Sequence, residues 1–466
     1  MPKKTDKKSI SMNRRDFLRG SVAIGGILAT QSFPGIVHAE NLGKDTINVA
    51  IIGTGEEGRV LLNACRGIPN LRFKATCDIW EYNRRRGQGA LRMFKQTAKP
   101  YVDYQEMLDA EKSGLDAVII ATPDFVHHEH SIACMKAGLH VYCEKLMSNS
   151  LEKAKQMVRT SRETGKLLQI GHQRRSNPRY QQVYNNLLGR AKLFGQVTAV
   201  NAQWNRSVSK SKELGCTERN KIDQATLEKY GYENMQQFRN WRWYKKYGGG
   251  PISDLGAHQI DIFNWFLKGN PISVMAGGGT DYFKQYEWED NVMAIYEFMT
   301  PTGIVRALYQ VQTTTSAGGG YFEYFMGTEG SIKMSESPKI TRIFREACAP
   351  SWNEWIAKNW IENFDPTKKI KPWQLPKPTG TVISDTDDGK VDLRESAVLD
   401  EFQLTVELNK PIHQPHLENF FGAVRGQNKL NCPGEVALAS AGTVLAVHDA
   451  VRAGKKIPLD ESQFKA

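Results

Sequence analysis

The chain has 466 residues, 40% hydrophobic and 24% charged, so it can bury a sizeable core and is long enough for two domains. Of its formal net charge of +12, the first 39 residues supply +5 through seven Lys/Arg and two Asp. The remaining positive charge forms no basic stripe interleaved with aromatic residues, which argues against a nucleic-acid partner. The seven cysteines show no CxxC or Cys/His spacing, so we predict no metal site.

Residues 1–39 have the features of an export signal. The stretch NRRDFLR, residues 13–19, precedes a mild apolar run, residues 21–33, that is too short to span a membrane. This pattern resembles a twin-arginine signal, and VHA, residues 37–39, offers a small-residue cleavage site. We therefore expect no membrane span, export through the twin-arginine machinery, and a periplasmic or other extracytoplasmic location.

A dinucleotide-binding pattern follows. TINVAIIG, residues 46–53, predicts a buried strand that runs into GTGEEG, residues 53–58, and a helix; a second strand then ends at a carboxylate. The glycines allow the backbone to approach a pyrophosphate, and the carboxylate accepts hydrogen bonds from ribose hydroxyls. The predicted contacts are Gly53, Thr54, Gly55 and Gly58 at the pyrophosphate and Asp78 at the ribose. Because a carboxylate repels a 2′-phosphate, NAD is favoured over NADP.

Further alternating strands and helices extend the first domain over residues 46–171, as a doubly wound parallel sheet. Ligands bind at the carboxyl ends of the strands of such a sheet. Two dipeptides occupy such positions, Thr122-Pro123 and Glu144-Lys145. A lysine there is either a solvated surface charge or a group beside the nicotinamide.

The stretch PISDLGAHQIDIF, residues 251–263, follows three glycines. One interpretation is a helix start that Asp254 caps, with His258 as a core histidine. The other is a catalytic wall, because residues three or four apart share one face of a helix. Asp254, His258 and Asp261 would then line a cleft.

Four motifs together resemble the glucose–fructose oxidoreductase, inositol dehydrogenase and rhizopine catabolism (Gfo/Idh/MocA) family of nicotinamide enzymes. They are ATPDFVH at 121–127, GLHVYCEK at 138–145, GGGPISDLGAH at 248–258 and FMGTEGSI at 325–332, and the resemblance covers residues 46–455. One departure is Leu146, where the family usually has proline. The resemblance implies cofactor contacts from Thr122, Pro123, His127, Glu144 and Lys145, and it implies that Lys145 meets Asp254 and His258 across the cofactor.

The chemistry of carbinol oxidation suggests a role for each of these three residues. A hydride leaves for the nicotinamide and a proton leaves for a base, and a histidine with a near-neutral pKa suits the second task. We predict His258 as the acid/base and Lys145 as the group that stabilises charge on the oxygen. Asp254 would orient the imidazole or hold a neighbouring hydroxyl. The scheme needs no metal.

The second domain, residues 172–455, is predicted to be α+β, with an open, mainly antiparallel sheet and insertions near 205–247 and 335–412. A sheet of this kind commonly makes a dimer interface in the family, so we expect a homo-oligomer, a dimer or a tetramer. Additional candidates for substrate binding are Arg174, Arg175, Tyr180, Trp241 and Asp261. For Arg174, Arg175 and Tyr180, ordinary ion pairs between the domains are an equal alternative.

Three functions are consistent with these patterns. The first is an exported NAD-dependent oxidoreductase acting on a sugar, polyol or derivative. The second is a glycosidase that keeps its NAD, oxidises a sugar carbon transiently, eliminates the aglycone and returns the hydride. The third is a cofactor-binding sensor without turnover, which the presence of Lys145, Asp254 and His258 disfavours. Because free NAD is scarce outside the cytoplasm, a tightly held cofactor would suit the first function as well as the second.

Overall fold

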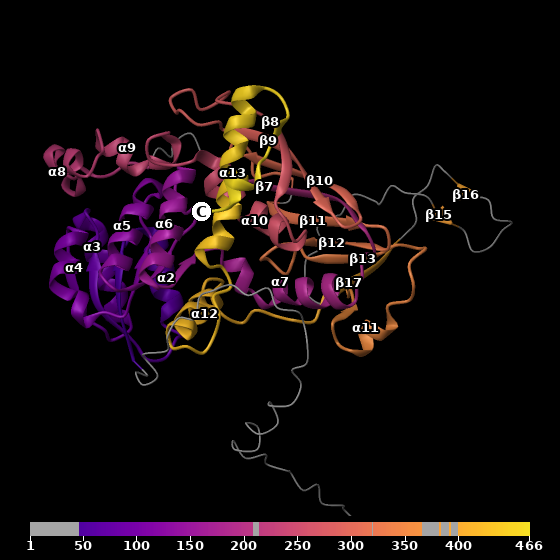
Figure 1. Ribbon diagram of the computed structural model, residues 1–466, viewed down its shortest axis with the longest axis horizontal. Helices are drawn as coiled ribbons and strands as arrows, with labels where there is room; N and C mark the ends of the chain where they lie inside the picture. Colours follow the sequence, from indigo (N-terminus) through magenta and orange to yellow (C-terminus); the bar gives the residue numbers. More distant parts are fainter. Residues whose placement is uncertain (1–45, 208–213, 319, 366–381, 384–390, 393–398) are drawn as a thin grey trace, which may run out of the picture. The chain divides into compact units, whose positions relative to one another are not determined.

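The structure is a computed structural model that describes residues 46–207, 214–318, 320–365, 382–383, 391–392 and 399–466 (Figure 1). The predicted signal, residues 1–39, and much of the predicted insertion at 335–412 lie outside these residues. The described residues form a six-stranded sheet and a ten-stranded sheet, with a separate pair of two-residue strands, β15 (Val382–Ile383) and β16 (Val391–Asp392).

The first sheet is parallel throughout and has the strand order β3-β2-β1-β4-β5-β6. Its strands are β1 (Ile47–Ile52), β2 (Leu71–Cys77), β3 (Lys99–Tyr101), β4 (Ala117–Ile120), β5 (His140–Cys143) and β6 (Leu168–Ile170). The connecting helices are α2 (Glu56–Cys65), α3 (Glu81–Met93), α4 (Tyr104–Glu111), α5 (Asp124–Lys136) and α6 (Leu151–Thr164). This is the doubly wound parallel sheet that the sequence predicts.

Both faces of the first sheet are buried. Alternate residues of β1 enter two different hydrophobic clusters, Val49 and Ile51 on one face and Ala50 and Ile52 on the other. The near-continuous apolar sequence of β1 is explained by this burial, because a strand covered on both faces has no solvent side for polar residues.

The second sheet has the order β14-β17-β13-β12-β11-β7-β10-β9-β8-β18, and its only parallel pair within the described residues is β7 with β10. The predicted mainly antiparallel sheet is thus confirmed. Its strands are β7 (Val197–Asn205), β8 (Pro271–Gly279), β9 (Asn291–Thr300), β10 (Gly303–Gln312), β11 (Tyr321–Gly327), β12 (Gly330–Met334), β13 (Arg342–Arg345), β14 (Ile361–Asn363), β17 (Asp400–Leu404) and β18 (Ile457–Pro458).

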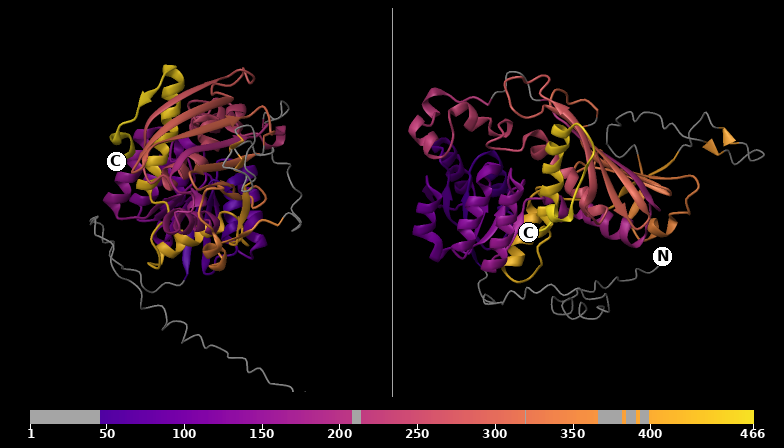
Figure 2. Two further views of the ribbon diagram at one scale, coloured as in Figure 1. Left: turned by 90° about the vertical axis from the view of Figure 1, so that its right-hand side faces the viewer. Right: turned by 45° about the horizontal axis from the view of Figure 1, so that its top comes forward.

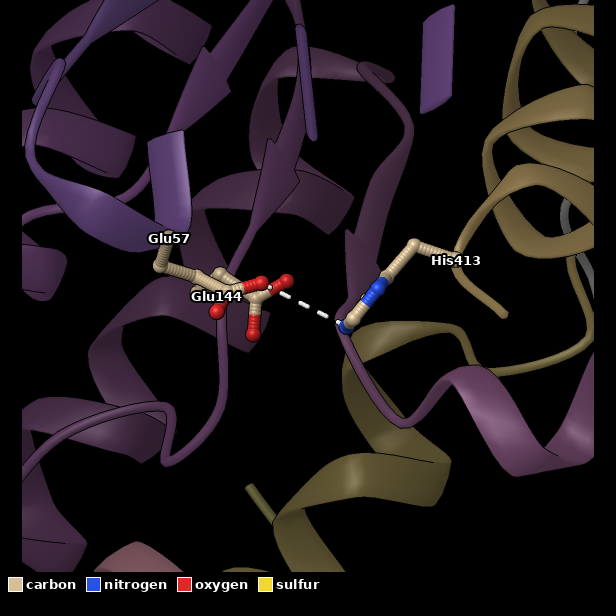
Figure 3. A group of neighbouring side chains, drawn as sticks. All are labelled: Glu57, Glu144 and His413. Carbon is tan, nitrogen blue, oxygen red and sulfur yellow. Dashed lines mark ion pairs between the residues drawn. The ribbon is translucent and has the colours of Figure 1, made fainter. Parts of the chain in front are cut away.

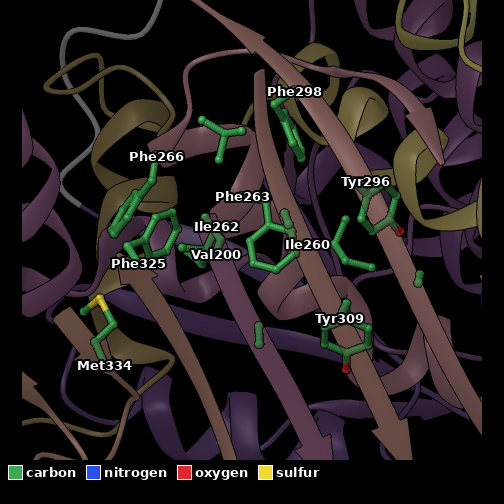
Figure 4. Packing of buried hydrophobic residues seen from close by; sticks show 14 of the residues in the cluster. Val200, Ile260, Ile262, Phe263, Phe266, Tyr296, Phe298, Tyr309, Phe325 and Met334 are labelled. Atoms are coloured by element: carbon green, nitrogen blue, oxygen red, sulfur yellow. The ribbon is translucent and has the colours of Figure 1, made fainter. Parts of the chain in front are cut away.

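One face of this sheet carries the helix that begins at the predicted catalytic histidine. The segment opens as a π-helix, η6 (Ile252–Gly256), and continues as α10 (Ala257–Phe266). Ile260 and Phe263 of α10 lie in a buried cluster with Tyr296 of β9 and Phe325 of β11 (Figure 4). Burial of this apolar surface fixes the helix on the sheet and so fixes the position of His258.

The C-terminal helices connect the two sheets. α12 (Gln414–Val424) buries Leu417 and Phe420 in a core of the first sheet. α13 (Gly434–Ala453) contributes Leu438 to the other core of the first sheet and Val444 to the core of the second (Figure 2). Among the described residues α13 alone is long and apolar enough to cross a membrane, but most of it is buried, as in a core helix of a globular fold.

The remaining short elements connect these parts. They are α7 (Pro178–Gln182), α8 (Gln224–Lys229), α9 (Met235–Arg239), α11 (Asn353–Ala357), the π-helix η3 (Val183–Arg190), and the 3-10 turns η1 (Lys112–Gly114), η2 (Gln173–Ser176), η4 (Glu218–Asn220), η5 (Trp241–Trp243) and η7 (Glu461–Phe464).

Candidate active site

The glycine-rich turn between β1 and α2 has the shape of a dinucleotide cradle. A Cβ on Gly53 would lie 2.4 Å from the carbonyl oxygen of Ala121, and one on Gly58 would lie 2.0 Å from the carbonyl oxygen of Gly53. A Cβ on Gly55, by contrast, would meet only the Asn83 side chain, at 3.7 Å. The turn is therefore packed against the protein at two glycines and open at Gly55, before the N-terminus of α2, which is the geometry that admits a pyrophosphate.

Asp78 stands directly after β2, next to this turn. Its Oδ2 accepts a 2.8 Å hydrogen bond from the backbone N–H of Thr54, and its Oδ1 accepts one of 2.9 Å from Trp80. Burial raises the pKa of the Asp78 carboxyl, and these hydrogen bonds oppose the shift. The carboxylate is thus held beside the turn, where it can accept bonds from ribose hydroxyls.

Thr122 and Pro123 follow β4 and lead into α5. The ring of His127, one turn into α5, is buried, with Nε2 2.6 Å from the carbonyl oxygen of Thr122 and Nδ1 2.7 Å from that of Leu146. His127 therefore connects two strand-end loops, and its predicted contact with a cofactor stays a prediction. The peptide bond between Lys145 and Leu146 is cis, although residue 146 is not proline.

Glu144, at the end of β5, belongs to a group of three titratable side chains that the sequence does not predict. Glu57 of α2 approaches it from the glycine-rich turn, and His413 comes from the segment before α12 (Figure 3). Nε2 of His413 lies 3.3 Å from Oε1 of Glu57. Burial first, and then the charge of Glu57, raise the pKa of Glu144. Glu57 and Glu144 each had a local signal, in the glycine motif and at the strand end, whereas His413 had none.

Lys145 meets Asp254, although 109 residues separate them, and the described residues include no hydrogen bond between Lys145 and His258. Its Nζ donates a hydrogen bond to the backbone oxygen of Asp254 and lies 3.8 Å from Oδ1 of the same residue. Asp254 has two further cationic neighbours: Nε of Arg242 donates to Oδ1 at 2.9 Å, and Nη2 of Arg206 donates to Oδ2 at 3.2 Å. These cations, Arg242 above all, outweigh burial and lower the pKa of the Asp254 carboxyl.

His258 lies at the start of α10, with its ring 5.5 Å from that of Trp204. Its Nδ1 is buried and has no hydrogen-bond partner among the described residues. Burial, followed by the positive charge of Lys145, holds the pKa of His258 well below its usual value, so the ring is neutral at pH 7.

Asp254 makes no hydrogen bond to His258 within the described part of the chain. Its two carboxylate oxygens, at the π-helix η6, accept hydrogen bonds from Arg242 and Arg206 instead. The predicted orientation of the imidazole by Asp254 is therefore not among the contacts of this structure.

Four of the predicted substrate-binding residues lie in buried ion-pair networks instead. Arg175 pairs with Asp261 at 2.8 Å, and Ser440 donates to the same carboxylate at 2.6 Å. Arg174 pairs with Glu323 and Glu336, and the Tyr180 hydroxyl donates to Glu323 at 2.9 Å. All four side chains are buried and join secondary-structure elements, and their role in substrate binding stays a prediction.

The fifth, Trp241, lies under Arg242, whose guanidinium carbon is 4.3 Å from the ring centroid. Both belong to residues 218–247, which we call the strap. The strap contacts the loops that follow four strands of the first sheet. Asn220 accepts a hydrogen bond from Trp80 after β2, Tyr230 donates to Asp103 after β3, Tyr247 accepts from Phe125 after β4, and Lys246 accepts from Asn149 after β5. The strap therefore runs along the carboxyl edge of the sheet.

Comparisons with known proteins identify relatives of both parts of the chain. Residues 47–172 match the family described as "Oxidoreductase family, NAD-binding Rossmann fold", and residues 221–333 match the "GFO/IDH/MocA C-terminal domain". Together these two matches span slightly more than half of the chain.

Two curated relatives and one solved structure illustrate the similarity. The 1,5-anhydro-D-fructose reductase of Ensifer adhaerens is 26% identical over 237 residues, 50% of this chain and 62% of that enzyme. The 2,7-anhydro-N-acetylneuraminate hydratase of Escherichia coli K12 is 26% identical over 235 residues, 49% of this chain and 54% of that enzyme. The matches thus span less than two thirds of either relative.

The solved structure is the WlbA dehydrogenase of Bordetella pertussis in complex with NADH and UDP-GlcNAcA. It superimposes with a TM-score of 0.61 at 18% identity and covers 89% of this chain and 99% of that one. At this identity the match establishes the shared fold.

Proposed function

Since this chain belongs to the Gfo/Idh/MocA family of oxidoreductases, we propose that it transfers a hydride at a carbinol carbon of a sugar, polyol or derivative. The observation that carries the proposal is the contact of Lys145 with the segment of Asp254 and His258, beside the carboxyl edge that holds the glycine-rich turn. The relatives named above act on sugar derivatives, which supports this substrate class.

The residues divide the chemistry as follows. NAD, when bound, accepts or supplies the hydride. His258, neutral at pH 7, takes the hydroxyl proton during oxidation and returns it during reduction. Lys145 donates a hydrogen bond to the reacting oxygen and stabilises its developing charge. Asp254, whose described partners are cations, positions Lys145 rather than the imidazole.

The choice of NAD over NADP rests on Asp78. Its half-buried carboxylate, held by Thr54 and Trp80, lies where the ribose hydroxyls would bind, and a 2′-phosphate would be repelled there.

We also propose that the cofactor is held tightly. The strap contacts four strand-end loops, and Tyr232 and Tyr247 pack against Phe125 in a small hydrophobic cluster of its own. Release of a dinucleotide from this edge would require these contacts to open. A retained cofactor also suits the second candidate function, a glycosidase that oxidises a sugar carbon transiently, eliminates the aglycone and returns the hydride. One relative is named as a hydratase.

Export is proposed from the sequence. The paired arginines at positions 14 and 15 and the apolar run after them support passage through the twin-arginine machinery to the periplasm. Fractionation of cells that express the wild type and an Arg14→Lys/Arg15→Lys variant tests this. The wild type should appear in the periplasmic fraction and the variant in the cytoplasm.

A homodimer through the second sheet is also proposed. The face of this sheet opposite α10 exposes a set of apolar side chains from adjacent strands: Met275, Met293, Ile295, Met299, Ile304 and Leu308. A contiguous apolar sheet face of this kind is typical of an interface. Analytical ultracentrifugation should find a dimer or tetramer, and Ile295→Lys should shift the mass towards the monomer.

The experiment that tests the function uses purified protein without its signal. Cofactor is first extracted and identified by mass spectrometry; the absorbance of reduced nicotinamide is then followed with pools of sugars, polyols and glycosides, with and without added NAD. A rise that tracks added NAD indicates a dissociable-cofactor dehydrogenase. Consumption of substrate by protein with bound NAD, without a sustained rise, indicates internal return. Absence of both bound cofactor and turnover would contradict the proposal.

A further inference from the structure

The carboxylate of Asp254 is outnumbered by the cations around it. Lys145 and Arg242 lie at its Oδ1, and Arg206 lies at its Oδ2. The side chains of Lys145 and Asp254 are only 12% and 21% exposed, so water screens the charges of this pair poorly. The buried carboxyl of Asp124 is close enough to sense Lys145 and Arg242, but burial raises its pKa to about 7, so it supplies only part of a negative charge. The site therefore carries an excess of positive charge.

The arginines also have hydrogen-bond donors to spare. A guanidinium carries five N–H groups. Within the described residues, Arg206 and Arg242 each use one of these groups in a hydrogen bond, in both cases to Asp254. Their side chains are 51% and 41% exposed. Arg242 stacks on the ring of Trp241, and this contact restricts the movement of its guanidinium.

The two arginines belong to different structural elements. Arg242 belongs to the strap, at the cofactor edge, where its charge also acts on Glu57 of α2. Arg206 follows β7 of the second sheet and binds the opposite oxygen of Asp254. Phosphates of a dinucleotide would therefore neutralise Arg242 before Arg206. Arg206, on the side of the second sheet, would keep its charge.

We propose that the substrate is a carbohydrate that carries an anionic oxygen group, and that Arg206 binds this group. The guanidinium fork fits a carboxylate, a sulfate or a phosphate in the same bidentate manner, so the shared chemistry is the oxyanion. The inference rests on the proposed function for the identity of the substrate as a carbohydrate. A binding measurement tests it without requiring turnover.

The test compares matched sugars by isothermal titration against the protein with its cofactor. The pairs are methyl glucoside with methyl glucuronide and methyl galactoside with methyl galacturonide. Glucose 6-sulfate and glucose 6-phosphate are also titrated, to show whether the bound oxyanion is a carboxylate, a sulfate or a phosphate. We expect at least one anionic member to bind about 10- to 100-fold more tightly than its neutral partner, the range of one charge-assisted hydrogen bond. This preference should decrease as NaCl is raised.

Variants assign the preference to Arg206. Arg206→Gln should abolish it, so that the anionic and the neutral member of a pair bind with affinities equal to within about twofold. Arg206→Lys should restore part of it, and the exposed Arg219→Gln is the matched control that should change nothing. Equal or weaker binding of all anionic members, or a preference that survives Arg206→Gln in folded protein, would overturn the inference. Turnover of neutral sugars alone would overturn it and leave the proposed function standing.

Discussion

The cofactor side and the substrate side of the candidate site are built in different ways. On the cofactor side, Gly53, Gly55 and Gly58 lie within six consecutive positions, and the carboxylate that completes the site ends the next strand. On the substrate side, Asp254 meets Lys145 across 109 residues, Arg206 across 48 and Arg242 across 12. A site made of one local unit can be recognised from its sequence, whereas one assembled by packing depends on the whole fold.

The largest effect should come from the residue that connects the two sides. Lys145→Met removes the proposed hydrogen bond to the reacting oxygen and should lower kcat/KM about 10²- to 10³-fold. Cofactor content, measured by extraction and mass spectrometry, should be unchanged, because the glycine-rich turn and Asp78 remain. The exposed Lys136→Met is the control. If activity persisted in Lys145→Met, the substrate side would have been assigned to the wrong residues.

The next prediction concerns the free energy of unfolding of the whole protein as the pH falls. Burial lowers the pKa of five histidines to about 3 or 4: His127, His130, His140, His172 and His416. Each stabilises the fold above the usual histidine pKa, and that contribution is lost as the pH falls. Three buried carboxyl groups with raised pKa act in the opposite direction: Asp124, Glu144 and Glu323.

With His258, whose pKa is also held well below its usual value, the unfolded chain should bind about three more protons than the folded one, six less three, between about pH 6 and pH 5. The free energy of unfolding should fall by about 4 kcal/mol per pH unit there. Urea unfolding followed by tryptophan fluorescence measures this slope, and His130→Gln should reduce it by about 1.4 kcal/mol per pH unit. A free energy that is constant or rises towards acid would show that these buried groups do not titrate as described.

The smallest effect tests the cofactor side alone. Asp78→Ser should weaken NAD binding about tenfold relative to NADP, because the ribose loses an acceptor and a 2′-phosphate is no longer repelled. The ratio of the two dissociation constants is the informative quantity, since the loss of the bond to Thr54 affects both cofactors. The exposed Asp109→Ser should leave the ratio unchanged. The same ratio in Asp78→Ser and wild type would assign cofactor choice to other residues.

The two sides also differ in how far they could be predicted. The parallel sheet and the glycine turn follow from patterns in the sequence, because each requires residues at fixed short spacings. The Arg175–Asp261 pair could not be foreseen, since nothing in either stretch indicates that the two side chains meet in the interior rather than in a cleft. Arg206, Arg242 and His413 were missed for a related reason. Their relevance arises only when the second sheet, the strap and α12 are placed against the first sheet.

The most direct test of hydride transfer uses methyl glycosides, including the uronates above, that carry deuterium on their ring carbons. The purified protein with its cofactor is quenched during incubation, and the nicotinamide is analysed by mass spectrometry. The account predicts that reduced cofactor gains one deuterium with the wild type and none with Lys145→Met, whether or not the cofactor leaves the protein. Consumption of the labelled sugar by cofactor-loaded protein, with no deuterium in the nicotinamide, would contradict it.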